Sequence, residues 1–183
     1  MNIWGAMLKM TGWRVDITAP RRDKCVICVA PHTSNWDFVL GLAAYRSLGR
    51  EANFLMKKFW FFWPLKYLLY HYGGIAVESR KKSGKSLTEQ IVADFNRRDY
   101  MNLAVTPEGT RSRTDAWHTG FLYIAYGAKV PIQLGVIDFK NKIIRIADEY
   151  HPTGDATADM AAIKRYYADK AAWARYPEKF TTA

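Results

Sequence analysis

The order of the apolar segments predicts an α/β fold, a single-domain layered fold in which helices flank a mostly parallel central sheet. Short apolar runs rich in β-branched residues alternate with helical patterns through about the first 130 residues. This order is typical of parallel strands joined by helical crossovers. Two further strands and a helix then predict a C-terminal hairpin and helix. With 183 residues, the chain is long enough for one domain with a full hydrophobic core.

Residues 1–20 are predicted to form an amphipathic N-terminal helix. Lys9 lies inside its apolar part, and the chain has no uncharged span of about 18 residues, so we expect neither a signal peptide nor a transmembrane helix. The helix is predicted because apolar side chains recur at helical spacing; these are Ile3, Trp4, Met7, Leu8 and Met10.

Residues 24–140 are predicted to form the core that carries the functional motifs. The run 24–30 is apolar and β-branched and predicts a buried strand, which Pro31 ends. A polar residue among 33–35 can cap the next helix, predicted at about 36–48.

The later elements follow from hydrophobic spacing and from the positions of Gly and Pro. The turn Lys140-Asn141 predicts the hairpin, and an apolar stripe from Met160 to Tyr167 predicts a C-terminal helix at 156–176. The other predicted elements are strand 52–56, helix 64–72, strand 75–77, a polar and basic loop at 78–85, helix 86–97, strand 101–105, helix 119–126, and strands 130–139 and 142–147.

The most apolar and aromatic segment lies between residues 59 and 70. Pro64 suits the first turn of a helix within it, while Lys66 and the short length argue against a membrane span. Its aromatic content is typical of an interface or of the wall of an apolar pocket. Packing inside the core explains the same pattern, and the sequence leaves these alternatives open.

The charge of the chain favours anionic partners. Lys and Arg number 27 against 17 Asp and Glu, which gives a formal net charge of +10. Nucleic acid, an anionic membrane surface and a phosphorylated small molecule are all compatible with this excess.

Cys25 and Cys28 form a C-x-x-C pair that could indicate redox chemistry or a zinc site. They lie inside an apolar strand, however, and an offset of three places them on opposite faces. No second cysteine pair is present to complete a zinc site. We therefore expect two buried thiols in a reducing compartment.

The candidate catalytic residues are His32 and Asp37, which lie five positions apart at a predicted strand-to-helix turn. A histidine with a carboxylate one helical turn further on is suited to act as a general base with its orienting acid. A capping or hydrogen-bonded surface histidine is the alternative interpretation of this pair.

A second polar motif, Pro107 to Ser112, follows another predicted strand. Gly109 permits an unusual backbone turn, and Arg111 can grip a phosphate with its forked guanidinium. A loop salt bridge between Glu108 and Arg111 is the alternative. Since ligands gather at the carboxyl ends of parallel strands, we expect both motifs at one edge of the sheet.

Together, the two motifs resemble those of the lysophospholipid acyltransferase family, typified by 1-acylglycerol-3-phosphate acyltransferases. His32 and Asp37 match the family's H-x-x-x-x-D block, and Pro107 to Ser112 match its F-P-E-G-T-R-S block, with Thr106 in place of Phe. Val130-Pro131-Ile132 match a V-P-I block. The resemblance covers about residues 25–140.

The chain departs from the family at two places. Ser79 stands where the family has an arginine that helps to bind the acceptor phosphate, and Arg80 comes one residue later. His118 stands where relatives often carry a lysine. These departures make the acceptor pocket harder to infer than the catalytic pair.

The resemblance implies transfer of an acyl group from a thioester to a lipid hydroxyl. His32 would be the general base and Asp37 its partner, as in a Ser-His-Asp triad without the serine. The acceptor would be placed by Glu108, Gly109, Thr110 and Arg111, with Arg80 as a helper.

The expected partners follow from that activity. They are a lysophospholipid acceptor, an acyl-CoA or acyl carrier protein as donor, and an anionic membrane surface. We expect no further cofactor, no metal and no nucleic acid. The enzyme would be cytoplasmic and peripheral on the inner face of the membrane.

Other interpretations remain open. A thioesterase or lipid hydrolase could use the same His–Asp pair with water, although no G-x-S-x-G elbow is present. A nucleic-acid-binding module fits the charge but has no recognised motif here, and a catalytically inactive scaffold is the third alternative. The acceptor, the donor, the chain length and the oligomeric state are left undetermined.

Overall fold

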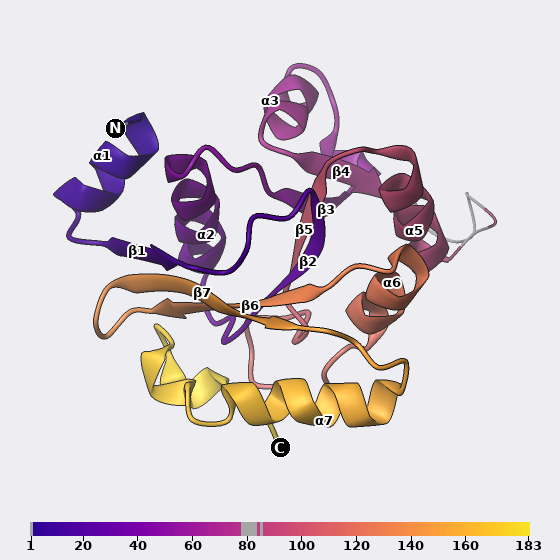
Figure 1. Ribbon diagram of the computed structural model, residues 1–183. Coiled ribbons are helices and arrows are strands. Elements are labelled where there is room, and N and C mark those ends of the chain that lie inside the picture. The colour runs from indigo at the N-terminus through magenta and orange to yellow at the C-terminus, as the bar shows by residue number, and fades with distance from the viewer. Residues whose placement is uncertain (1, 78–83, 85) are drawn as a thin grey trace.

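In the computed structural model, which describes residues 2–77, 84 and 86–183, the chain is built around a seven-stranded sheet (Figure 1). Its strand order is β1-β7-β6-β2-β5-β3-β4. All neighbouring strands are parallel except β6 and β7, which form the antiparallel hairpin. The predicted α/β fold with a C-terminal hairpin and helix is therefore confirmed.

The strands are β1 (Arg14–Ile17), β2 (Lys24–Val29), β3 (Asn53–Lys57), β4 (Gly74–Val77), β5 (Met101–Val105), β6 (Ile132–Asp138) and β7 (Ile143–Tyr150). The α-helices are α1 (Ile3–Met10), α2 (Asn35–Ser47), α3 (Leu65–His71), α5 (Leu87–Arg97), α6 (Gly120–Ala128) and α7 (Ala156–Tyr167). Short 3-10 helices are η1 (Lys58–Trp60), η2 (Ala171–Trp173) and η3 (Pro177–Lys179).

The central strand β2 is buried on both faces, so the core has two layers. Val26 and Cys28 pack with side chains of α5, α6 and α7. Cys25 and Ile27 face the opposite side, where α1 and α2 cover the sheet. Hydrophobic burial on two faces explains why the sequence of β2 is a continuous apolar run rather than an alternating one.

The two cysteines have the environment that the sequence predicted. Both are free and fully buried, and they lie in different core clusters on opposite faces of β2. Burial raises the pKa of the Cys25 thiol to about 12, which leaves it protonated and unreactive at neutral pH.

The predicted N-terminal helix at 1–20 is wrong in extent. Helix α1 ends at Met10, and Gly12 turns the chain at φ +79°. The next residues form β1, which pairs with β7 through Arg14↔Ile143 to Ile17↔Ile146. Strand β1 was missed because its partner lies about 130 residues further along the chain, where local spacing carries no signal.

The predicted C-terminal helix at 156–176 is also too long. Helix α7 ends at Tyr167, and short 3-10 turns follow. The helix cannot continue because the backbone is used elsewhere: the Trp173 carbonyl accepts a hydrogen bond from Phe139 N–H, and Ala174 and Phe180 are buried against the body of the protein. The C-terminal tail is therefore packed against the protein.

A buried carboxylate on α7, Asp159, joins this helix to α6 and to β7. Its oxygens accept hydrogen bonds from the hydroxyls of Tyr126 (2.6 Å) and Tyr150 (2.7 Å), and from Thr153 and Gly154. The side chain is fully buried. These hydrogen bonds outweigh the cost of burial and hold the pKa of Asp159 well below its usual range.

Replacing Asp159 by Asn should lower the free energy of unfolding by roughly 2–4 kcal/mol. The amide removes the negative charge, and its NH₂ group would face the hydroxyl and N–H donors that now bind the carboxylate. Urea unfolding at pH 7 measures this change. Asp155→Asn is the matched control, since Asn caps a helix as well as Asp does. Equal stability of the two variants would contradict the role of Asp159.

Candidate active site

The loop between β2 and α2 places His32 at the carboxyl end of the central strand. Ser34 begins α2 as its N-cap, and its hydroxyl accepts a hydrogen bond from Trp36 N–H at 3.2 Å. Asp37 completes a capping box, because its side chain accepts a hydrogen bond from the Ser34 N–H. The same residues that start the helix therefore fix the position of the carboxylate.

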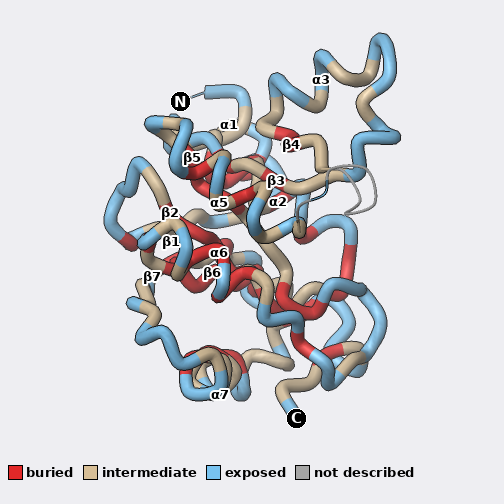
Figure 2. Tube along the Cα trace, turned by 90° about the vertical axis from the view of Figure 1, so that its right-hand side faces the viewer, coloured by how far each residue is buried: buried red, intermediate tan, exposed pale blue. Residues whose placement is uncertain are grey.

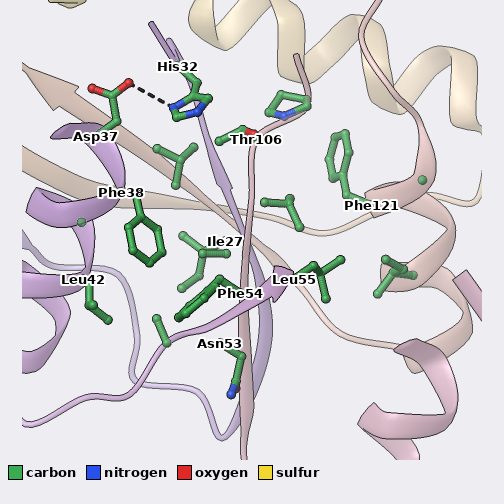
Figure 3. A pocket seen from close by; sticks show the side chains of 18 of the residues that line it. Ile27, His32, Asp37, Phe38, Leu42, Asn53, Phe54, Leu55, Thr106 and Phe121 are labelled. Carbon is green, nitrogen blue, oxygen red and sulfur yellow. Dashed lines mark hydrogen bonds and ion pairs between the residues drawn. The ribbon is translucent and has the colours of Figure 1, made fainter. Parts of the chain in front are cut away.

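One oxygen of Asp37 organises this loop. Asp37 Oδ2 lies 3.1 Å from His32 Nδ1 and accepts the backbone N–H groups of Thr33 and Ser34, both at 2.9 Å. The Asp37 side chain is 2% exposed. An ionised carboxylate only accepts hydrogen bonds, so Nδ1 must carry the proton, and Nε2 keeps its lone pair. Figure 3 shows this pair at one end of a pocket.

Glu108 holds the same histidine from the other motif. Its Oε1 accepts the His32 backbone N–H at 2.7 Å, although the two residues lie 76 positions apart. The residue is 2% exposed. Burial, and to a lesser degree the nearby charge of Asp37, raises the pKa of Glu108 to about 7, while the hydrogen bond from His32 opposes this rise. Glu108 thus joins the loop after β5 to the loop after β2.

The rest of the second motif lies at the surface. Gly109 adopts φ +62°, and a Cβ there would come within 2.5 Å of the His118 ring, so only glycine fits this turn. Thr110 is exposed, and its hydroxyl accepts Ser112 N–H. Arg111 is exposed and donates to the side chain of Asn35, the first residue of α2. Within the described residues, these contacts replace the alternative Glu108–Arg111 salt bridge.

Two residues considered in the sequence analysis, Ser79 and Arg80, lie outside the residues that the structure describes, as does most of the basic loop at 78–85. In the described ranges, no group of three or more His, Cys, Asp or Glu side chains is arranged to hold a metal ion.

A cavity of about 540 Å³ extends from His32 between the sheet and its helices (Figure 3). Most of its walls are apolar. The space is open to solvent on one side and lined mainly by apolar side chains, which is the usual character of a ligand pocket. The apolar lining residues labelled in Figure 3 are Ile27, Phe38, Leu42, Phe54, Leu55 and Phe121.

These wall residues were not predicted from the sequence. Phe38, Leu42 and Tyr45 share one face of α2, and their helical spacing is the one signal that could have grouped them. The same spacing is equally typical of a helix packed in the core. The cavity between α2 and the sheet is what distinguishes a pocket wall from a helix packed in the core.

Comparison with known proteins gives one match. A family model described as Acyltransferase matches residues 14–137. No curated protein and no solved structure matches the chain.

Replacing Glu108 by Gln tests the buried carboxyl, because the amide oxygen can still accept the His32 N–H. The folded protein keeps the Glu108 proton up to about pH 7, whereas the unfolded chain loses it near 4.5. Between these values the folded state binds more protons, so the free energy of unfolding of the wild type should fall as pH rises, by on the order of 1–3 kcal/mol relative to Glu108→Gln.

Urea unfolding of both proteins from pH 4 to 8 measures this difference. Other titrating groups are common to the two proteins and cancel. Parallel stability curves would show that Glu108 ionises normally in the folded state.

Proposed function

Because the chain belongs to the acyltransferase family, which its family model matches over residues 14–137, we propose that it transfers a fatty acyl group from a thioester to the hydroxyl of a lysophospholipid. The observation that carries this proposal is the pair His32–Asp37 at the end of an apolar cavity. A base at one end and a hydrocarbon-lined space beside it suit a substrate with a reactive carbonyl and a long chain.

The proposed mechanism uses His32 as the general base. His32 Nε2 removes the proton of the acceptor hydroxyl while the hydroxyl oxygen attacks the thioester carbonyl carbon. The tetrahedral intermediate collapses, the carbon–sulfur bond breaks, and the imidazolium returns the proton to the thiolate. Asp37 stabilises the imidazolium through Nδ1, and general-base help of this kind contributes roughly 10²–10⁴-fold. No acyl-enzyme is formed.

Residues of the second motif support this chemistry from two positions. Arg111 and Thr110 lie exposed beside the start of α2, where they are available to a phosphorylated head group. Glu108 is buried and bonded to His32 N–H, so we assign it the positioning of the base rather than contact with the head group. The donor is acyl-CoA or acyl carrier protein, and no described contact distinguishes them.

A second part of the proposal concerns the membrane. Among the residues that the structure describes, no helix is both long and apolar enough to cross a bilayer. The aromatic excursion, which we define as residues 58–72, is instead exposed: Phe59 is 81% and Trp63 75% accessible. It follows β3, whose residue Met56 lines the cavity.

The aromatic excursion lies beside α1. Trp4 packs edge-on against Tyr72 at 5.9 Å, and both Figures 1 and 2 show α1 and α3 at the same end of the molecule. Exposed Ile3 and Met10 add to this surface. Residues 52–77 contain three lysines and no Asp or Glu. Exposed aromatic rings with lysines and no acidic residue fit the interface of an anionic bilayer.

Replacing His32 by Ala should lower acyl transfer by roughly 10²–10⁴-fold without unfolding the protein. Release of thiol and formation of acylated lipid, each with and without lysophosphatidate, measure transfer and separate it from hydrolysis. His151→Ala, an exposed histidine just beyond the end of β7, is the control. Retained transfer in folded His32→Ala protein would end the general-base assignment, and equal thiol release without acceptor would favour a thioesterase.

Replacing Phe59 and Trp63 together by Ser should reduce binding to vesicles of phosphatidylglycerol and phosphatidylcholine by at least about tenfold, because two interfacial rings are lost. Flotation at low salt measures the bound fraction. Tyr123→Ser, which removes an exposed ring from α6, is the control and should bind as the wild type does. Unchanged flotation of the double variant would exclude the aromatic excursion as the membrane contact.

A further inference from the structure

The cavity passes through the sheet between β3 and β5. These strands pair over two positions only, Asn53↔Leu103 and Phe54↔Ala104. Beyond them β3 stays with β4 as far as Lys57↔Val77, so β3 and β5 separate at Leu55 and Val105. Figure 3 shows the strand that carries Phe54 and Leu55 turning away across the pocket. Both Leu55 and Val105 line the cavity at this opening.

The cavity therefore has two lobes on opposite faces of the sheet. The first, the α2 lobe, is bounded by Ile27, Val29, Phe38, Leu42, Tyr45 and Ala104. The second, the α6 lobe, is bounded by Leu55, Leu87, Val105, Phe121 and Ile124. Strand alternation separates the two sets, since Phe54 packs against Phe38 at 4.8 Å while Leu55 joins the core cluster of α6.

His32 lies where the lobes meet. In Figure 3, Phe38 and Leu42 lie on one side of the pocket, Leu55 and Phe121 lie on the other, and His32 and Thr106 lie at its end. An acyl transfer brings together two lipids, the donor chain and the acceptor. One base at the junction of two apolar lobes can serve both at once.

The lobes differ in how they end. The far end of the α2 lobe is closed by Tyr45, Ala52 and Ile146, which are 3%, 9% and 6% exposed. The α6 lobe is bordered by Leu87, which is 44% exposed, and by the exposed His118. A closed lobe suits the transferred chain, whose reactive end lies at His32. An open lobe suits a chain whose polar head group stays in water.

We infer that the α6 lobe binds the acyl chain that the acceptor lysolipid already carries, while the α2 lobe holds the chain being transferred. This inference rests on the proposed acyl transfer and adds the site of the acceptor chain. The enzyme would accordingly hold both hydrocarbon chains inside the protein during the reaction. A polar acceptor without a chain would leave the α6 lobe unfilled and bind weakly.

Two glycines allow each lobe to be blocked separately. Gly41 lines the α2 lobe from α2, and a Cβ there would meet only Ile137 at 4.0 Å; Gly120 lines the cavity at the start of α6, where a Cβ would meet nothing within 4 Å. Neither has a positive φ, so Leu fits both backbones. Gly41→Leu and Gly120→Leu should therefore fold while obstructing different lobes.

The test measures binding in the His32→Ala protein, which cannot turn over. The probes are S-hexadecyl-CoA, a thioether that cannot be cleaved, and 1-palmitoyl-lysophosphatidate, both followed by calorimetry. We expect the two to bind together, Gly120→Leu to weaken the lysolipid at least tenfold, and Gly41→Leu to weaken the thioether at least tenfold. Each substitution should change the other Kd less than threefold.

Two further variants serve as controls. Tyr123→Leu places a leucine on the exposed face of α6, outside the cavity lining, and should change neither Kd. Leu55→Trp obstructs the α6 lobe from the strand and should repeat the effect of Gly120→Leu.

Competition between the two probes, or weakening of the thioether by Gly120→Leu and Leu55→Trp, would overturn the assignment. Because binding needs no turnover, the outcome is separate from that of the proposed function. Independent binding in a wild-type protein that forms no acylated lipid would overturn acyl transfer alone. Product formation with competing probes would overturn the α6 lobe alone.

Discussion

The hydrogen bonds that converge on Asp37 Oδ2 set the geometry of the site. This one oxygen receives His32 Nδ1 and the N–H groups of Thr33 and Ser34, so the same contact that starts α2 also orients the imidazole. A buried carboxylate is costly unless several donors surround it. Two of the three donors to Oδ2 are backbone N–H groups of the loop, so a rearrangement of the loop would remove them from the buried charge.

A second carboxyl and the C-terminal tail hold the loop from outside. Glu108 accepts His32 N–H, and Tyr176 N–H donates to the Thr33 hydroxyl at 3.2 Å. Tyr176 lies beyond the segment that the family model matches. The ring of His32 is thus oriented by its own helix, while its backbone loop is held by β5 and by the tail. Such support keeps a base in place without contact to substrate.

Much of this arrangement could be predicted from the sequence, for physical reasons. Strand–helix alternation and the continuous apolar run of β2 indicate a buried parallel sheet, and parallel strands bring His32 and Glu108 to one edge. Local spacing carries no information on distant pairing, however, so β1, which needs β7, was missed, and helix α7 was extended into residues whose backbone bonds to Phe139. Nor does apolar character distinguish burial from exposure, and the rings at Phe59 and Trp63 proved to be outside.

In the candidate site, too, local sequence predicts some features, while others depend on contacts between distant residues. The residue types of His32 and Asp37 and their spacing on a helix start predict their contact. The role of Glu108 depends on a hydrogen bond to a backbone N–H 76 positions away, which no motif encodes. The lobes depend on where β3 leaves β5, which is a property of the strand pairing and not of any single residue.

Asp37 fixes His32 with its proton on Nδ1 and its lone pair on Nε2. Nitrogen-15 chemical shifts of the His32 ring, assigned by comparison with His32→Ala and recorded at a pH where the ring is neutral, report the tautomer directly. We expect a protonated Nδ1 and an unprotonated Nε2. A protonated Nε2 in the neutral ring would leave no lone pair facing the cavity and would contradict the proposed base.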